Sequence, residues 1–324
     1  MKYGALPGIG KPISRLVQGT ATDMDTSDPE ACFALLDMAL AHGINTFDQA
    51  HVYGAALSQT LGRWMQERGV RDQVVILAKG AHQSDRPRVT PEDIISDLHD
   101  ALTWLQTDRV ELYVLHRDNP AVPVGPIVQT LNALQRQGKI GAFGGSNWSV
   151  ARLQEANDYA RAHSLAPFAV SSPNFSLAEQ VQPPWADCLT ISGPQHEADR
   201  AWYAQSDMAL FPWSSLAGGF FSDRFHRDNV EALAAQGGFA QIAVRCYCYE
   251  PNFQRLDRAR LLAEQKGRTV PQIALAFVLC QPLNIFPLIS CASQAMFDAN
   301  TAALDIMLTP QEMAYLDLKA DAPA

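Results

Sequence analysis

The sequence predicts a parallel (β/α)8 barrel, the TIM-barrel fold of the α/β class, with residues 1–324 forming a single domain. Short apolar strands alternate with amphipathic helices eight times along the chain, and barrels of this kind routinely fill such a length. The rival fold is an open doubly wound sheet, which normally carries G-x-G-x-x-G after its first strand. Gly19-Thr20-Ala21-Thr22 does not have that form, so the barrel is favoured.

The strands and helices follow from their apolar periods and from the residues that bound them. Ser27-Asp28-Pro29-Glu30 and Thr90-Pro91-Glu92-Asp93 are typical of helix starts, and Gly43 and Gly138 of helix ends. The predicted strands are residues 16–21, 44–48, 74–80, 110–116, 141–147, 168–172, 208–213 and 284–288. The predicted helices are residues 29–42, 57–68, 91–105, 127–138, 149–163, 199–205, 252–267 and 270–280.

Two stretches lack a clear period. Residues 2–14, rich in glycine and proline, predict an irregular segment or a small hairpin before the barrel. Residues 218–247 have a loop-like composition with two Gly-Gly pairs, and we expect a long loop on the carboxyl-end face of the barrel, serving as a lid or binding loop.

Composition excludes some classes of function. Hydrophobic residues make up 47% of the chain and charged residues 18%, which are globular values. A net charge of −9 argues against binding nucleic acid or an anionic membrane surface. The N-terminus has no apolar signal region, and the scattered cysteines indicate reduced thiols, so we expect a cytoplasmic protein. The cysteines are Cys32, Cys188, Cys246, Cys248, Cys280 and Cys291.

Three predicted strands each close on one ionisable residue. Asp48, Lys79 and His116 end strands two, three and four, and Tyr53 lies in the loop after Asp48. Because the carboxyl ends of barrel strands converge on one face, these four groups are expected to meet in one pocket. Asp48 could instead cap an ordinary turn, and Tyr53 beside Gly54 could simply pack.

The four residues suit proton transfer. A buried ammonium at Lys79 needs a carboxylate partner, and Asp48 is the natural one. The cation is expected to lower the pKa of the Tyr53 phenol and so make it a general acid. A neutral His116 could donate a hydrogen bond to a substrate carbonyl oxygen. The alternatives are a structural ion pair and a hydrogen-bonded strand-end histidine.

Together with these four residues, three further segments show a family resemblance. They are Gly141-Ala142-Phe143-Gly144-Gly145-Ser146-Asn147-Trp148, Phe211-Pro212-Trp213-Ser214-Ser215-Leu216-Ala217-Gly218-Gly219 and Phe286-Pro287-Leu288-Ile289-Ser290. Over essentially its whole length the chain resembles the aldo-keto reductase superfamily. The resemblance implies a (β/α)8 fold that binds an extended nicotinamide dinucleotide without a metal, with Asp48, Tyr53, Lys79 and His116 as the catalytic tetrad.

The resemblance also implies a set of cofactor contacts. Ser146 and Asn147 would hold the carboxamide, Trp213 would stack on the nicotinamide, and Asn300 matches an adenine-side asparagine. Ser172 stands where the family usually has glutamine, so fewer hydrogen bonds are expected there. The full implied set is Gly19, Thr20, Asp48, Ser146, Asn147, Ser172, Trp213, Ser214, Leu216, Gly218, Ser290, Ser293, Gln294 and Asn300.

The cofactor is expected to be NAD(H) or NADP(H), with NAD(H) favoured. Members that prefer NADPH usually present Lys or Arg after the last strand to bind the 2′-phosphate. Residues 288–300 contain neither, and a phosphate without a charged partner loses its strongest hydrogen bonds. An arginine from residues 218–247, namely Arg224, Arg227 or Arg245, could still reach across.

The substrate side is expected in the loops after strands one to five and seven. Its polar character, with one indole, suits a hydroxylated carbonyl compound such as an aldose or keto-sugar, although the long loop could admit bulkier ketones. Each candidate could equally be solvated loop surface. The candidates are Thr22, His51, His82, Arg117, Asn119, Trp148 and Phe220.

Two other functions were weighed. A metal-dependent barrel hydrolase needs clustered histidine and carboxylate ligands, often His-x-His on strand one, which the sequence lacks. The family fold also serves as a non-catalytic, nucleotide-sensing regulatory subunit. The intact tetrad favours an enzyme that moves hydride between nicotinamide and a carbonyl or alcohol, with Tyr53 as general acid and base. The oligomeric state stays open.

Overall fold

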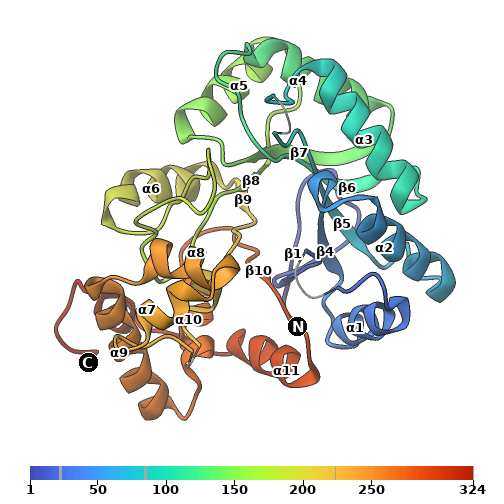
Figure 1. Cartoon of the computed structure of the whole chain (residues 1–324). Helices are drawn as coiled ribbons and strands as arrows, with labels where there is room; N and C mark the ends of the chain where they lie inside the picture. Colours follow the sequence, from blue (N-terminus) through green and yellow to red (C-terminus); the bar gives the residue numbers. More distant parts are fainter. Residues whose placement is uncertain (22–23, 84–85, 223, 324) are drawn as a thin grey trace.

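The computed structural model describes residues 1–21, 24–83, 86–222 and 224–323. Within that part of the chain, eight parallel strands curl into a barrel in the order β10-β3-β4-β5-β6-β7-β8-β9, with helices around the outside (Figure 1). A parallel bridge between Leu210 and Ile285 joins β9 to the segment before β10 and so closes the ring. The strands are β3 (Val17–Gly19), β4 (Thr46–Ala50), β5 (Val75–Gly80), β6 (Val110–Leu115), β7 (Ile140–Ser146), β8 (Val170–Ser172), β9 (Ala209–Leu210) and β10 (Leu288–Ile289).

The predicted barrel is confirmed, and its helices begin where the capping residues placed them. The side chain of Asp28 accepts a hydrogen bond from the backbone N–H of Ala31, and Thr90 caps α3 in the same way. The α-helices are α1 (Pro29–Ala41), α2 (Ala55–Arg68), α3 (Pro91–Leu105), α4 (Val124–Arg136), α5 (Val150–Ala162), α6 (Glu197–Ser206), α7 (Val230–Ala235), α8 (Gly238–Tyr247), α9 (Glu250–Lys266), α10 (Val270–Leu279), α11 (Gln294–Ala303) and α12 (Pro310–Leu316). None of the helices in the described part of the chain is long and apolar enough to cross a membrane.

The expectation of a structureless loop over residues 218–247 is wrong. This segment contains most of a 3-10 turn, Ala217–Gly219, followed by α7 and α8. Gly237 and Gly238 both have positive φ and form the joint between the two helices, so the Gly-Gly pair breaks a helix rather than marking a loop. Leu233, Ala243 and Tyr247 bury one side of this helical pair, which anchors it to the core.

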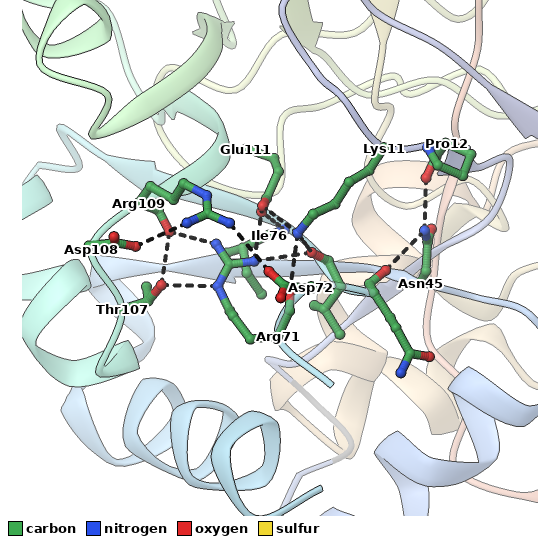
Figure 2. A network of polar contacts seen from close by, with 12 residues as sticks. Lys11, Pro12, Asn45, Arg71, Asp72, Ile76, Thr107, Asp108, Arg109 and Glu111 are labelled. Atoms are coloured by element: carbon green, nitrogen blue, oxygen red, sulfur yellow. Dashed lines mark hydrogen bonds and ion pairs between the residues drawn. The ribbon is translucent and has the colours of Figure 1, made fainter. Parts of the chain in front are cut away.

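The predicted N-terminal hairpin is present, as β1 (Tyr3–Gly4) paired with β2 (Ile13–Ser14), and the segment between them contributes to an ion network. Glu111 lies near the start of β6 with only 7% of its surface exposed. It accepts hydrogen bonds from Lys11 Nζ at 2.8 Å, Arg71 Nη1 at 2.9 Å and the backbone N–H of Ile76 at 2.9 Å (Figure 2). The network ties the amino-terminal ends of β5 and β6 to the hairpin, at the barrel end associated with stability rather than chemistry.

Candidate active site

The opposite, carboxyl-terminal end of the same strands holds a second buried ion pair. Lys79 Nζ lies 2.7 Å from Asp48 Oδ1, and each side chain is only 3% exposed. Backbone pairing of Ala50 with Lys79 aligns β4 with β5, and Thr20 Oγ1 donates to the backbone oxygen of Asp48 at 2.8 Å. The predicted partnership of Asp48 and Lys79 is confirmed, and it fixes both side chains in the barrel wall.

Tyr53 lies directly above this pair. It ends a 3-10 turn, His51–Tyr53, and its hydroxyl donates to Asp48 Oδ2 at 3.5 Å. Its ring meets the ring of His116 edge-on, with centroids 6.3 Å apart. The sequence therefore placed the four groups correctly, because all of them meet at one end of adjacent strands.

The expected lowering of the Tyr53 pKa is wrong in direction. Burial raises the pKa of the Tyr53 phenol well above its ordinary value, and the Asp48 carboxylate raises it further. The physical reason is that burial penalises the phenolate most, and the Asp48 carboxylate that accepts the phenol's hydrogen bond adds to the rise. The phenol is thus held in its protonated form at neutral pH.

His116 is held neutral. Burial, followed by the positive charges of Lys79 and Arg117, lowers the pKa of its imidazole well below the ordinary value. Its Nδ1 is buried and has no hydrogen-bond partner among the described residues. A proton on Nδ1 would be a buried, unpaired N–H, which is costly, so the tautomer with the proton on Nε2 is favoured. That tautomer presents a donor at Nε2.

The residues after β7 and β8 form a connected polar group. Ser146 Oγ donates to the backbone oxygen of Ser172 at 2.7 Å, and Asn147 Nδ2 donates to Ser146 Oγ at 3.1 Å and to the backbone oxygen of His116. Asn147 Oδ1 in turn accepts from the backbone N–H of Leu189. The Ser172 hydroxyl donates to the backbone oxygen of Phe211 at 2.7 Å. Its only proton is therefore engaged, in line with the weaker contact expected at Ser172.

The loop after β9 fits a dinucleotide. The indole of Trp213 is half-buried, and its Nε1 is a buried donor without a partner among the described residues. Asn147, Ser214 and Ala217 all have positive φ, a strained conformation for residues other than glycine that tends to gather at functional sites. Gly218 adopts it as well, at φ 61°. A buried indole N–H without a partner among the described residues is a donor that a bound ligand can satisfy.

The residues expected on the adenosine side come from β3, β10 and α11. A Cβ on Gly19 would lie 3.6 Å from Ser290 Oγ, so these two residues are neighbours. The Ser293 side chain caps α11. Gln294 donates to Asp298 Oδ1 at 3.1 Å, and the buried Asn300 amide donates to Cys291 Sγ at 3.1 Å. The residues expected near the 2′-phosphate thus carry hydroxyls and amides, and the nearby Asp298 carboxylate is paired with His42 Nε2 at 3.0 Å.

The alternative arginines are engaged elsewhere. Arg227 pairs with Glu250 and Asp257, and these carboxylates raise the pKa of its guanidinium. Arg224 Nη2 donates to Gln236 Oε1 at 2.8 Å. Arg245 donates to the backbone oxygen of Pro184 at 2.7 Å and to that of Pro183.

Several expected substrate contacts point elsewhere. Trp148 is buried, with Nε1 donating to the backbone oxygen of Arg117, and Phe220 is fully buried among other phenylalanine rings, so both expectations are wrong. His51 stacks on Trp104 and pairs with Asp100 on α3. An aromatic next to a motif can face either the pocket or the core, and here packing area decided for the core.

Of the remaining candidates for substrate contact, two lie beside His116, one lies further along the same loop, and one is not among the described residues. The half-buried His82 ring packs edge-on against His116 with centroids 4.8 Å apart. Arg117 directly follows His116 and is buried. Asn119 lies further along the same loop, where its backbone oxygen accepts from Arg152. Thr22 lies outside the described residues.

One segment near the site was missed by the sequence analysis. Residues 173–193, between β8 and α6, bring Leu189 to Asn147 and Cys188 to Arg117, with Cys188 Sγ 3.4 Å from Arg117 Nη2. We had expected substrate loops after strands one to five and seven only. The unusual length of this connection, with no apolar period, was the available signal.

The fold and site together define a class. A parallel barrel with a buried Asp–Lys pair, a protonated tyrosine and a neutral histidine at the carboxyl ends of its strands is built for acid–base chemistry on a polar bond. Residues 15–321 match the model of the Aldo/keto reductase family. The chain belongs to that family.

Its relatives are distant but match over most of their length. The chain is 26% identical over 332 residues to the uncharacterized oxidoreductase YrpG of Bacillus subtilis, covering 98% of this chain and 95% of the relative. It is 25% identical to an NADP(+) aryl-alcohol dehydrogenase of Phanerodontia chrysosporium, covering 96% of this chain and 83% of that protein. A crystal structure of the thermostable aldo-keto reductase Tm1743 with the inhibitor epalrestat superposes with a TM-score of 0.74 over 99% of this chain and 100% of that chain, at 21% identity.

Proposed function

We propose that this protein is a nicotinamide-dependent carbonyl reductase, working in reverse as an alcohol dehydrogenase. The observation that carries the proposal is the Tyr53 hydroxyl, held protonated beside the neutral His116 and the buried Asp48–Lys79 pair. A bound nicotinamide dinucleotide supplies or accepts the hydride. The family membership and the NADP(+)-linked aryl-alcohol dehydrogenase among the relatives support this reading.

The chain's own residues then have distinct tasks. The Nε2–H of His116 donates to the carbonyl oxygen, orienting and polarising it. Tyr53 delivers its proton to the same oxygen as negative charge develops there. Asp48 anchors Lys79 and accepts from the phenol, so it sets the direction of the Tyr53 hydroxyl. In the oxidative direction the phenol must first lose its proton, which its raised pKa disfavours.

The dinucleotide would be held mainly by residues after β7 and β9 and by α11. Ser146 keeps a lone pair for a carboxamide N–H, because its own proton is donated to Ser172. Trp213 offers a stacking face and an unpaired indole donor. NAD(H) is favoured over NADP(H), because the residues around Gln294 offer no Lys or Arg and include the exposed Asp298.

The substitution Tyr53→Phe tests the proposal. Removing the acid should lower the rate of aldehyde reduction by roughly 10²–10⁴-fold, the usual contribution of general acid catalysis. The affinity for NADH, measured by quenching of tryptophan fluorescence, should change less than about threefold. The lost hydroxyl contacts Asp48 and none of the residues proposed to hold the dinucleotide after β7 and β9. Equal loss of binding and turnover would contradict the assigned role.

A second candidate is a nucleotide-sensing subunit. A probable voltage-gated potassium channel subunit beta of Oryza sativa subsp. japonica is 25% identical over 96% of this chain and 94% of its own. Stoichiometric binding of NADH without steady-state turnover of aldehydes and ketones would favour this reading. The tetrad is complete, and both His116 and Tyr53 hold the proton that reduction needs. These features support an enzyme over a sensing subunit.

A further inference from the structure

Arg117 is a buried cation with unusual partners. It is 5% exposed, and its Nη1 donates to the backbone oxygen of His116 at 2.9 Å while Nη2 lies 3.4 Å from Cys188 Sγ. A guanidinium has five N–H donors, and sulfur is a weak acceptor. Among the described residues, no carboxylate forms an ion pair with Arg117.

The acidic groups around Arg117 are already engaged. Asp118, the next residue, pairs with Arg152 at 3.1 Å. Asp97 holds Arg88 at 2.5 Å, and Asp187 accepts from the neutral side-chain amide of Gln83 and forms no ion pair with Arg117 among the described residues. Burying an uncompensated charge is expensive, so an anion that pairs with Arg117 would recover part of that cost.

The guanidinium also acts on the groups proposed for chemistry. Its positive charge lowers the pKa of His116 and of His82, and it partly offsets the rise in the pKa of Tyr53. The geometry agrees, because the Arg117 guanidinium donates to the backbone oxygen of His116 at 2.9 Å and the His116 ring meets that of Tyr53 with centroids 6.3 Å apart. A second functional group of the same small molecule could reach it.

We propose that Arg117 binds an anionic group of the substrate, so that the preferred substrates are aldehydes or ketones bearing a carboxylate or a phosphate. This inference rests on the proposed carbonyl reduction and narrows its substrate class. A planar guanidinium pairs with either anion through two parallel hydrogen bonds. In a chain with a net charge of −9, an anion needs such a local cation, whereas a neutral sugar would leave Arg117 unpaired.

The test compares each acid with a neutral twin in the wild-type protein. The pairs are 4-oxobutanoate and 4-formylbenzoate against their methyl esters, and glyceraldehyde 3-phosphate against glyceraldehyde, with NADH and NADPH. We expect kcat/KM to favour at least one acid by roughly 100-fold, the size expected when hydrogen bonds to a charged group are lost. Whether the carboxylates or the phosphate show the preference identifies the source of the anion.

Two variants separate recognition from structure. Arg117→Ala should remove the preference for the acid, and added guanidinium ion should restore turnover of the acid while leaving the ester unchanged. Arg117→Lys should keep part of the preference for the acid, because lysine keeps the positive charge but cannot make the two parallel hydrogen bonds of a guanidinium. Circular dichroism of both variants checks the fold, and the acid-to-ester ratio of the wild type remains decisive if Arg117→Ala does not fold.

The failures are distinguishable. Equal turnover of acid and neutral twin in the wild type, or equal loss of both in Arg117→Ala without rescue, would overturn the role of Arg117 and leave carbonyl reduction standing. No turnover of any pair with either dinucleotide would instead overturn the proposed function.

Discussion

The buried pair of Asp48 and Lys79 should be strongly coupled in stability. Two unit charges 2.7 Å apart attract by about 6 kcal/mol at an effective dielectric constant of 20. Each side chain is only 3% exposed, so removing one partner leaves the other charge buried and unpaired. Asp48→Asn or Lys79→Met alone should therefore lower the free energy of unfolding by about 3–5 kcal/mol. The double variant should cost clearly less than the sum, with a coupling free energy of about 3 kcal/mol.

The assay is urea unfolding followed by circular dichroism for the wild type, both single variants and the double variant. The control is the same cycle on Arg63 and Glu67, an exposed pair 3.2 Å apart on α2. Because water screens that pair, its coupling should stay below about 0.5 kcal/mol. If the costs at Asp48 and Lys79 added within about 0.5 kcal/mol, the two charges would not form the buried pair on which the site is built.

Two further predictions concern pH and cofactor choice. Burial and Asp48 raise the pKa of Tyr53, and burial lowers the pKa of His116, so both groups keep the protonation needed for reduction from about pH 6.5 to about pH 10. The kcat for reduction should therefore be nearly constant over this range, while the rate of alcohol oxidation should rise with pH. A reduction rate that falls with pH near neutrality would contradict these protonation states. The double variant Gln294→Arg with Asp298→Asn adds an arginine and removes the carboxylate that would otherwise pair with it. It should tighten NADPH binding roughly tenfold in a fluorescence titration and leave NADH binding unchanged. An equal gain for both dinucleotides would show that the 2′-phosphate lies elsewhere.

The barrel and the positions of Asp48, Lys79 and His116 could be predicted because they follow from strand periodicity, whereas Tyr53 lies in the turn after β4. Asp48, Lys79 and His116 each stand at or near the end of an apolar strand, and parallel strands place their ends together. The helix caps at Asp28 and Thr90 could also be predicted, because a cap depends on residue types and spacing that are local in the sequence. These features need no knowledge of long-range distances.

Features that depend on three-dimensional distances were missed or misjudged. The sign of the pKa shift at Tyr53 depends first on how deeply the phenol is buried and then on its hydrogen bond to Asp48, and only the folded geometry sets both. The directions of Trp148 and Phe220 depend on which face of their segments packs inward. The contact of residues 173–193 with Arg117 joins segments about which periodicity says nothing.

The central claim is hydride transfer to a carbonyl carbon, and isotope transfer tests it most directly. The protein would be incubated with NADH carrying two deuterium atoms at nicotinamide C4 and with 4-formylbenzoate, and the alcohol analysed by mass spectrometry. We expect an alcohol that carries one deuterium on the former carbonyl carbon, formed by the wild type and nearly absent with Tyr53→Phe. Absence of the labelled alcohol with every aldehyde tested, despite tight NADH binding, would contradict the central claim and favour the sensor reading.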